Sequence, residues 1–142
     1  MDLSDDDLAF LQEHHAAAMI TNGDDGMPKA VRVGIALVDG EIWSSGRLDR
    51  VRTRRLRADP RCTLFVFDPA YAYLTLETIV TILDGPDAPE HSVRLFRVMQ
   101  GMPTGPLTWY GQELDEEAFR QTMADEGRLI YRFDVQRAYG LR

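Results

Sequence analysis

The sequence predicts a mainly β protein with inserted helices, in which six mostly antiparallel strands form a small closed or nearly closed barrel. Strand-like segments recur along the chain, and tight-turn sequences such as Asn22–Gly26 and Asp39–Gly40 separate several of them. Helical patterns are expected only before the first strand, after the third and after the fifth. Because no linker or repeat interrupts this pattern, residues 1–142 are expected to form a single domain.

The first segments predict a helix followed by a three-stranded meander. Ser4 precedes three aspartates, which is typical of an N-cap with acidic residues in the first turn, so a helix is expected over Asp5–His14. The small residues Ala16–Thr21 suit either a helix or a strand, and the turn that follows them favours a strand. The next two strands are expected over the following ranges: Lys29–Val38 and Glu41–Ser45.

A short helix is expected after the third strand. Asp49 is the predicted N-cap, and Pro60 cannot extend a helix, so the helix is placed over Arg50–Arg57. The remaining predicted strands are Arg61–Phe67, Tyr71–Leu83 and Arg128–Val135. The remaining predicted helices are Pro89–Gln100 and Asp115–Glu126, with a loop over Gly101–Gly111 between them. Alternation places Tyr71 and Tyr73 on one strand face, where they could stack on a flat ring or fill an interface.

The composition excludes several classes of function. A net charge of −7 argues against general binding of nucleic acid. No apolar run is long enough to span a membrane, and the acidic N-terminus differs from a signal peptide, so a cytoplasmic protein is expected. The single cysteine, Cys62, lies in an apolar strand and is expected to fill the core. No spacing of histidines and cysteines predicts a metal site.

The most unusual stretch is residues 44–61, called here the arginine segment, which holds seven of the fifteen arginines and two aspartates. Such a basic segment in an acidic chain suggests an anionic ligand. Arg50, Arg52 and the Thr53 hydroxyl would lie in the first helical turn, near Ser44 and Ser45. Guanidinium groups, hydroxyls and backbone N–H groups at a helix N-terminus suit a phosphate. The alternative is a solvated amphipathic helix with no ligand.

The sequence carries no recognisable catalytic constellation. Neither a glycine-rich nucleotide motif nor a Ser/His/Asp arrangement can be placed. The His14–His15 pair at the first helix–strand joint is interpreted as structural, and the paired carboxylates Asp24–Asp25 and Glu116–Glu117 as solvated. If the protein is an enzyme, a bound cofactor is expected to supply its chemistry.

The pattern resembles the pyridoxamine 5′-phosphate oxidase-like split-barrel superfamily of flavin and deazaflavin oxidoreductases, and more narrowly its branch that uses coenzyme F420. The opening helix runs into a strand of small residues, as in that family. The other matching stretches are Gly26–Val33, Arg50–Arg61, Tyr71–Glu77 and Tyr139–Leu141. The arginine stretch ending in Asp-Pro-Arg is the most specific of these, and the match covers nearly the whole chain.

The resemblance implies an FMN-binding split barrel that works as a homodimer, with two cofactor sites at the subunit interface. It places the cofactor phosphate at Ser45, Arg50, Arg52 and Thr53, where Arg52 stands in place of the lysine of many relatives. The ring is implied to lie along Ala30–Gly34, with Val31 and Val33. The face carrying Tyr71 and Tyr73 would come from the second subunit.

Three functions remain open at this point. An F420-dependent oxidoreductase acting on a small organic substrate is favoured, because F420 carries an oligoglutamate tail as well as a phosphate and the arginines exceed what one phosphate needs. An FMN-dependent oxidoreductase of the same fold is the first alternative. The second is a protein that binds flavin or deazaflavin without turnover. The catalytic residues and the substrate are not predicted by the sequence.

Overall fold

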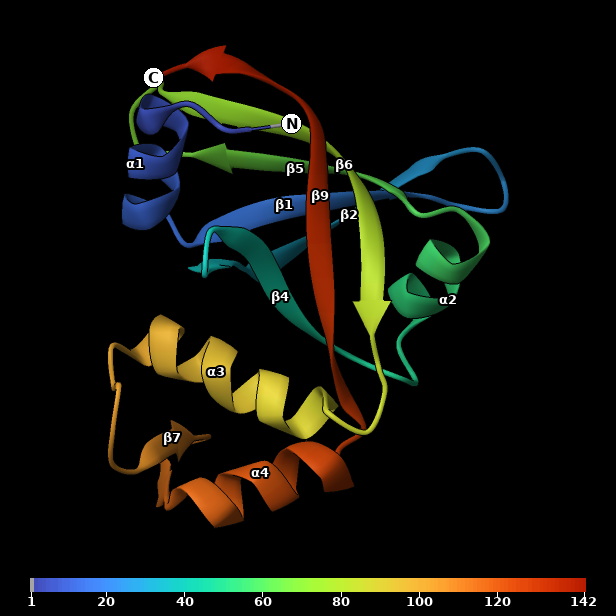
Figure 1. Cartoon of the computed structure of the whole chain (residues 1–142). Coiled ribbons are helices and arrows are strands. Elements are labelled where there is room, and N and C mark those ends of the chain that lie inside the picture. Colours follow the sequence, from blue (N-terminus) through green and yellow to red (C-terminus); the bar gives the residue numbers. More distant parts are fainter. Residues whose placement is uncertain (1) are drawn as a thin grey trace.

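The computed structural model describes residues 2–142 and confirms a mainly β fold with inserted helices (Figure 1). The strands are β1 (Ala16–Asn22), β2 (Pro28–Gly34), β3 (Ala36–Val38), β4 (Glu41–Arg47), β5 (Arg61–Phe67), β6 (Tyr73–Leu83), β7 (Leu107–Trp109), β8 (Gln112–Leu114) and β9 (Arg128–Leu141). The helices are α1 (Asp5–Glu13), α2 (Val51–Ala58), α3 (Ala88–Gln100) and α4 (Glu116–Asp125).

Seven strands form one antiparallel sheet in the order β2-β1-β5-β6-β9-β4-β3. The sheet curls around a core that includes the fully buried side chains of Met19, Leu64, Leu76 and Tyr131. Helices α1 and α2 lie at opposite ends of this barrel (Figure 1), and Leu11 and Leu56 reach from them into the core. The expected split barrel is therefore present, with seven strands where six were expected.

The expected strand Lys29–Val38 divides at Ile35 into β2 and β3. The Ile35 N–H donates to the His15 carbonyl oxygen at 2.8 Å, and this bond ties the chain to the start of β1 at the point where it turns. Before this point β2 pairs with β1, whereas after it β3 pairs with β4. The meander was therefore predicted correctly in its hairpins but not in this change of partner.

Two further boundaries differ from expectation. β9 continues to Leu141 rather than ending at Val135, because residues 128–133 pair with β4 and residues 130–141 pair with β6. The predicted loop over Gly101–Gly111 contains β7 and opens into a second two-stranded sheet with β8. Tyr110 has φ +48° at the turn of this hairpin, which is a conformation that turns require.

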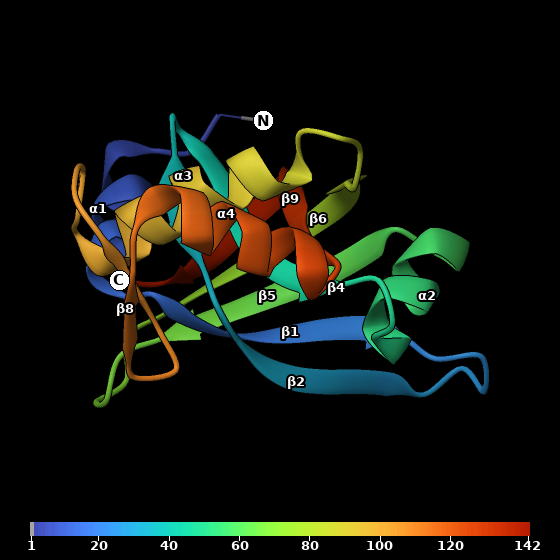
Figure 2. The ribbon, with the colours of Figure 1, turned by 90° about the horizontal axis from the view of Figure 1, so that it is seen from below.

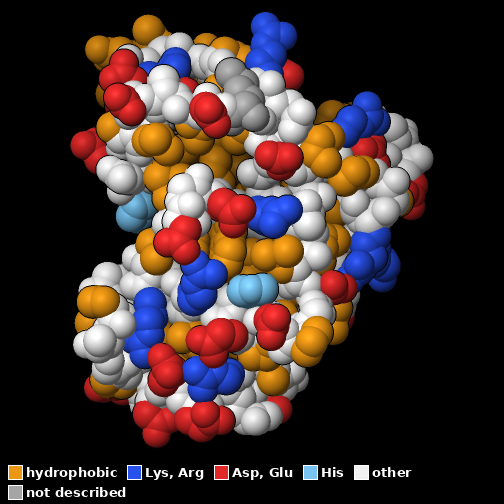
Figure 3. Space-filling view, viewed as in Figure 1, with side chains coloured by type: hydrophobic (Ala, Val, Ile, Leu, Met, Phe, Trp, Pro, Cys, Tyr) orange, Lys and Arg blue, Asp and Glu red, His pale blue; other side chains and the backbone are white. Residues whose placement is uncertain are grey.

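The segment between β6 and β9 forms a separate layer of α3, α4 and the β7–β8 hairpin, called here the helical layer. Figure 2 shows α3 and α4 in front of the barrel, with α2 at one end. The layer has its own core, which contains Leu107, Phe119 and Met123. On its outer surface acidic and basic side chains are interspersed (Figure 3).

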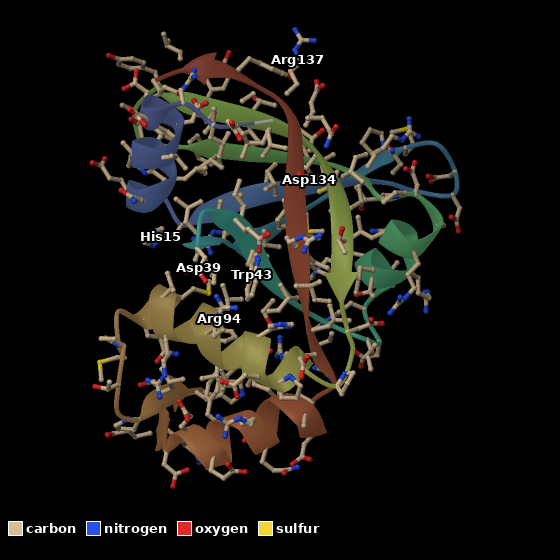
Figure 4. The ribbon with its side chains drawn as sticks, viewed as in Figure 1. His15, Asp39, Trp43, Arg94, Asp134 and Arg137 are labelled. Atoms are coloured by element: carbon tan, nitrogen blue, oxygen red, sulfur yellow. The ribbon has the colours of Figure 1, made fainter. Side chains whose placement is uncertain are left out.

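An aromatic and ionic contact fastens the helical layer to the barrel. Trp43 of β4 is buried against Leu95 and Ile130, and the Arg94 guanidinium lies 5.2 Å from the centre of its ring. Arg94 also pairs with Asp39 in the β3–β4 turn (Figure 4). Because these groups come from α3, β4 and the turn, they fix the layer against one face of β4.

Side-chain contacts hold both ends of the chain. Ser4 caps α1, with the capping box completed by Asp7, as the sequence indicated. The buried Asp7 carboxylate also pairs with Arg142, so the first helix is joined to the last residue. Among the described residues no helix is long and apolar enough to cross a membrane.

Candidate functional site

The candidate site is the gap where β2 and β4 part, called here the split. The Ser44 hydroxyl donates to the Gly34 carbonyl oxygen at 2.7 Å and joins the two strands at its closed end. Beyond this bond, β2 turns away to pair with β1, and from Ser45 to Arg47 β4 pairs with β9 alone. Backbone groups on one edge of each strand therefore lack a strand partner, which leaves them open to other partners.

Val31 marks the floor of the split. Its strand partner is Met19, which is fully buried, so Val31 lies on the core-facing side of β2. Val31 is nevertheless 36% exposed, whereas Val33 on the same side is only 6% exposed. The core-facing side of β2 is thus uncovered on the open side of Val33, where an apolar ring could lie.

The turn from β4 into α2 is built differently from the prediction. Asp49 is not the N-cap: its carboxylate accepts a hydrogen bond from the Arg47 guanidinium at 3.2 Å. Arg50 takes the N-cap position, with no side-chain cap, and α2 begins at Val51. The first turn of α2 therefore keeps backbone N–H groups that no side chain satisfies.

Thr53 fastens this turn to the barrel. It is fully buried, its hydroxyl donates to the Arg47 carbonyl oxygen at 2.7 Å, and it also contacts the Tyr131 hydroxyl. Gly46 packs against the same ring, where an added Cβ would lie 2.3 Å from Tyr131 Cζ. The Thr53 hydroxyl thus fastens the first turn of α2 to the end of β4 and to β9.

The predicted phosphate residues do not lie on one face of β4. Ser45 shares the face of Trp43, which points toward the helical layer. The Arg52 guanidinium instead lies 5.9 Å from the centre of the Tyr131 ring, on the side of Gly46. A ligand that contacts both Ser45 and Arg52 would have to pass around the free edge of β4, which is the edge that the split exposes.

Three buried polar atoms in this region have no hydrogen-bond partner: Ser45 Oγ, Arg47 Nε and Arg52 Nε. Buried polar groups are nearly always satisfied, so such atoms indicate a missing partner. All three belong to the arginine segment, and two are guanidinium donors. This donor set fits an oxyanion such as a phosphate.

The seven arginines of the arginine segment fall into two groups. Three form ion pairs: Arg47 with Asp49, Arg57 with Asp84, and Arg61 with Asp59. Arg61 and Asn22 hold the pKa of the Asp59 carboxyl well below its usual range, so this acid stays ionised. Within residues 2–142 the other four have no acidic partner: Arg50, Arg52, Arg54 and Arg55.

Arg54 and Arg55 line a groove between α2 and the β1–β2 turn, called here the basic groove, with a volume of about 530 Å³. Lys29 lies on its opposite wall. Lys29 shares the core-facing side of β2 with Val31 and Val33, because strand residues two apart lie on one side. Lys29 of the basic groove and Val31 beside the split therefore lie on the same side of β2, and sequence reasoning did not include Lys29 in the site.

Tyr71 and Tyr73 do not share a strand as expected. β6 begins at Tyr73, and Tyr71 lies in the preceding turn, where its side chain is 77% exposed. The Asp68 carboxylate holds this turn by accepting hydrogen bonds from the N–H groups of Ala70 and Ala72. Tyr73 lies on the outer face of the sheet. There it packs against Phe65, which also contacts Phe67.

Other candidate groups have structural partners. His15 Nε2 lies 2.7 Å from the Gln12 carbonyl oxygen, and the His14 ring packs on Phe10. Burial raises the pKa of the Cys62 thiol to about 12, which suits a core residue. Within residues 2–142 no group of histidines, cysteines and acids suits a metal ion.

Glu126 connects the arginine segment to the helical layer. Burial opposes its ionisation, but hydrogen bonds from Trp109 Nε1 at 2.9 Å and Arg128 Nε at 3.0 Å lower its pKa overall. Arg47 also contributes to this lowering through its charge. Trp109 of β7 is thereby tied through Glu126 to the first residue of β9, Arg128.

The curled antiparallel sheet and the split define a split-barrel protein. The family model described as pyridoxamine 5′-phosphate oxidase matches residues 3–141, and the chain belongs to this family. A search of the curated proteins found no match to the chain.

Three solved structures illustrate the likeness in fold. A conserved hypothetical protein of Mycobacterium tuberculosis is 22% identical, with a TM-score of 0.76 over 98% of this chain and 84% of that one. A protein titled F420 reductase is 20% identical, with a TM-score of 0.67 over 92% and 94%. A FAD-binding protein of Mesorhizobium loti is 14% identical, with a TM-score of 0.61 over 97% and 92%.

Proposed function

We propose that this protein binds coenzyme F420 in the split and is an F420-dependent oxidoreductase acting on a small organic substrate. The observation that carries the proposal is the set of arginines without acidic partners in residues 2–142: Arg50 and Arg52 at the start of α2, and Arg54 and Arg55, which line the basic groove. A phosphate alone would engage only Arg50 and Arg52, which are nearest the start of α2. Arg54 and Arg55 suit a ligand with further negative charges.

Each part of the site has an assigned role in this proposal. Arg50, Arg52 and Ser45 bind the phosphate, while Thr53 holds the turn that positions the two arginines. Val31 and Val33 form an apolar floor for the ring. The bound deazaflavin supplies a hydride, and the protein's contribution is to orient ring and substrate and to exclude water.

An FMN-dependent oxidoreductase is the second candidate, and one observation favours it. Arg47, Arg57 and Arg61 are already neutralised within the protein, so fewer arginines are available than the sequence suggested. One phosphate bound by Arg50 and Arg52 would then account for most of the site. In that case Arg54 and Arg55 would be solvated.

We further propose that the protein is a homodimer that acts in the cytoplasm. The outer face of the sheet carries Phe65, Phe67, Tyr73 and Tyr139, of which Phe67 is 56% and Tyr139 41% exposed. Such a row of aromatic side chains is unusual on a solvated face and suits an interface. In this proposal a second copy of the chain covers this row and contributes residues to the cofactor site.

The proposal is tested by titrating the purified protein with F420 and with FMN, followed by fluorescence. Binding of F420 at least tenfold tighter than that of FMN is expected. Tighter binding of FMN would establish the second candidate. Oxidation of reduced F420 in the presence of a panel of quinones, enones and nitro compounds then separates an enzyme from a protein that only binds the cofactor.

A further inference from the structure

Arg52 is held against the protein without being neutralised. Its guanidinium lies over the ring of Tyr131, with Cζ 5.9 Å from the ring centre, and within residues 2–142 it has no acidic partner and no hydrogen bond. Arg47, Arg57 and Arg61 are held instead by carboxylates, which cancel their charges. Because an aromatic face attracts a cation without accepting a conventional hydrogen bond, this contact leaves the charge and the N–H donors of Arg52 available.

Tyr131 is itself fixed in place. Its side chain is fully buried in the barrel core, and its hydroxyl contacts Thr53 in the first turn of α2. On the β4 side the ring packs on Gly46, where an added Cβ would lie 2.3 Å from Tyr131 Cζ. A ring enclosed on these sides cannot turn away, so it presents a rigid surface to the guanidinium.

The contact with the ring is compatible with binding of an anion. An oxyanion accepts hydrogen bonds from the N–H edge of a guanidinium, whereas an aromatic ring contacts its face. Both contacts can therefore exist at once, and an oxyanion does not have to displace Tyr131. A side chain that is ordered before the ligand arrives also avoids the entropy cost of ordering it on binding.

We propose that Tyr131 is a positioning residue that orders Arg52 for an oxyanion while leaving its charge free. The aromatic ring carries this role, and the hydroxyl fastens α2 through Thr53. The inference rests on the proposed function in taking Arg52 as a ligand of the cofactor phosphate. Exposed Arg54, two residues further along α2, has no such contact and serves as the mobile reference.

The first measurement is the side-chain order of Arg52 in the protein without ligand, from nitrogen relaxation of the arginine Nε–H groups. Tyr131→Phe keeps the ring, and Tyr131→Leu removes it. The matched control is Phe133→Leu, which removes a buried ring from the same side of β9 that has no arginine over it in the part of the chain described. Arg52 should be ordered in the wild type, Tyr131→Phe and Phe133→Leu, and as mobile as Arg54 in Tyr131→Leu.

The second measurement is the affinity for inorganic phosphate, followed at the Thr53 backbone amide by NMR titration. Tyr131→Leu should weaken binding about three- to tenfold, as suits the ordering of one long side chain. Tyr131→Phe and Phe133→Leu should stay within about twofold of the wild type. In an Arg52→Ala background Tyr131→Leu should cause no further loss, whereas a general loss of structure would lower the affinity in both backgrounds.

A third variant keeps the test open if Tyr131→Leu does not fold. Pentafluorophenylalanine in place of Tyr131 retains a flat ring of similar size, but fluorination reverses the charge distribution that attracts a cation. Relative to Tyr131→Phe, it should release Arg52 and weaken phosphate binding about two- to fivefold.

A mobile Arg52 in the wild type, or equal order of Arg52 with and without an aromatic ring at position 131, would overturn the proposal. So would the absence of phosphate binding, or an affinity that loss of the ring leaves unchanged or lowers equally in the Arg52→Ala background. A wild type that binds phosphate through an ordered Arg52 but does not bind F420 would instead count against the proposed function alone.

Discussion

The Ser44 hydroxyl bonds to the Gly34 carbonyl oxygen at 2.7 Å, and the two strands that it joins part immediately beyond it. The bond therefore sets where the barrel opens and how far β2 can lie from β4. Val31, Ser45 and Arg52 owe their positions around the split to this junction and to the Thr53–Tyr131 contact at the start of α2.

Replacing Arg52 should weaken cofactor binding without unfolding the protein. Arg52→Ala removes a charge-assisted contact, which is worth about 1.5–3 kcal/mol, or about tenfold to hundredfold in affinity. The dissociation constant of the cofactor is measured by fluorescence titration, and stability by circular dichroism. Arg57→Ala on the same helix is the control. Arg57 is already paired with Asp84, so its replacement should leave the affinity for the cofactor nearly unchanged.

Salt should distinguish tailed from tail-less ligands. The Debye length falls from about 10 Å at 0.1 M to about 3 Å at 1 M salt, which screens exposed pairs worth about 0.2–1 kcal/mol each. F420 binding should therefore weaken more steeply with salt than binding of a tail-less deazaflavin phosphate. Replacing Arg54 and Arg55 with Gln should remove the difference. Equal slopes in the wild type would show that these arginines are solvated.

Added bulk at Gly46 should destabilise the barrel. In Gly46→Ala the new methyl group would collide with the buried Tyr131 ring, and overpacking of this kind costs about 1–3 kcal/mol. Denaturant unfolding measures the loss. Gly85→Ala is the control, since no atom lies within 4 Å of its added Cβ. If both variants unfold alike, the close packing of Gly46 on Tyr131 is not maintained in solution.

The pH dependence of stability should report Glu126. Its pKa in the folded protein lies below the ordinary 4.5, so its charge stabilises the fold above that value and the contribution is lost as the pH falls through the folded pKa. The melting temperature of Glu126→Gln should be lower than that of the wild type at pH 7, and the gap should narrow as the pH falls below the ordinary pKa of 4.5 and through the folded pKa. Glu113→Gln, at an exposed site in β8, should show no such gap.

A charge on the outer sheet face should break the proposed dimer. Light scattering at micromolar concentration is expected to give twice the chain mass for the wild type. Phe67→Glu should shift the protein toward a monomer, because it buries an unpaired charge in the aromatic row. Tyr110→Glu is the control, as Tyr110 is 80% exposed on the distant β7–β8 hairpin. A monomeric wild type would refute the dimer.

The features that depend only on residues close together in the sequence were predicted from local patterns. The Ser4 cap, the hairpins and the arginine segment are encoded within a few residues. Asp49 was assigned the wrong role, because its nearest cation, Arg47, competes with the helix for the carboxylate. A pattern of residue types cannot decide that competition, and the same holds for the placement of Tyr71 in a turn.

Long-range contacts explain the parts of the site that sequence reasoning missed. The engagement of Thr53 depends on Tyr131, which lies 78 residues further along the chain. Lys29 enters the site only because β2 leaves β4 and brings its core-facing side toward α2. Neither relationship leaves a local trace in the sequence, although the position of Lys29 two residues before Val31 could have suggested a shared strand side.

The pairing of β6 with β9 has a consequence for how such proteins can diverge. Leu83 and Ile130 face each other across the two strands, so the entire helical layer leaves and rejoins the barrel at one point. Evolution can lengthen, shorten or exchange this insertion, as it would the tip of a hairpin, without moving a strand of the barrel. Grafting a short turn between Leu83 and Arg128 would remove the layer in one step, and it would expose Trp43 on the face of β4 that also carries Ser45.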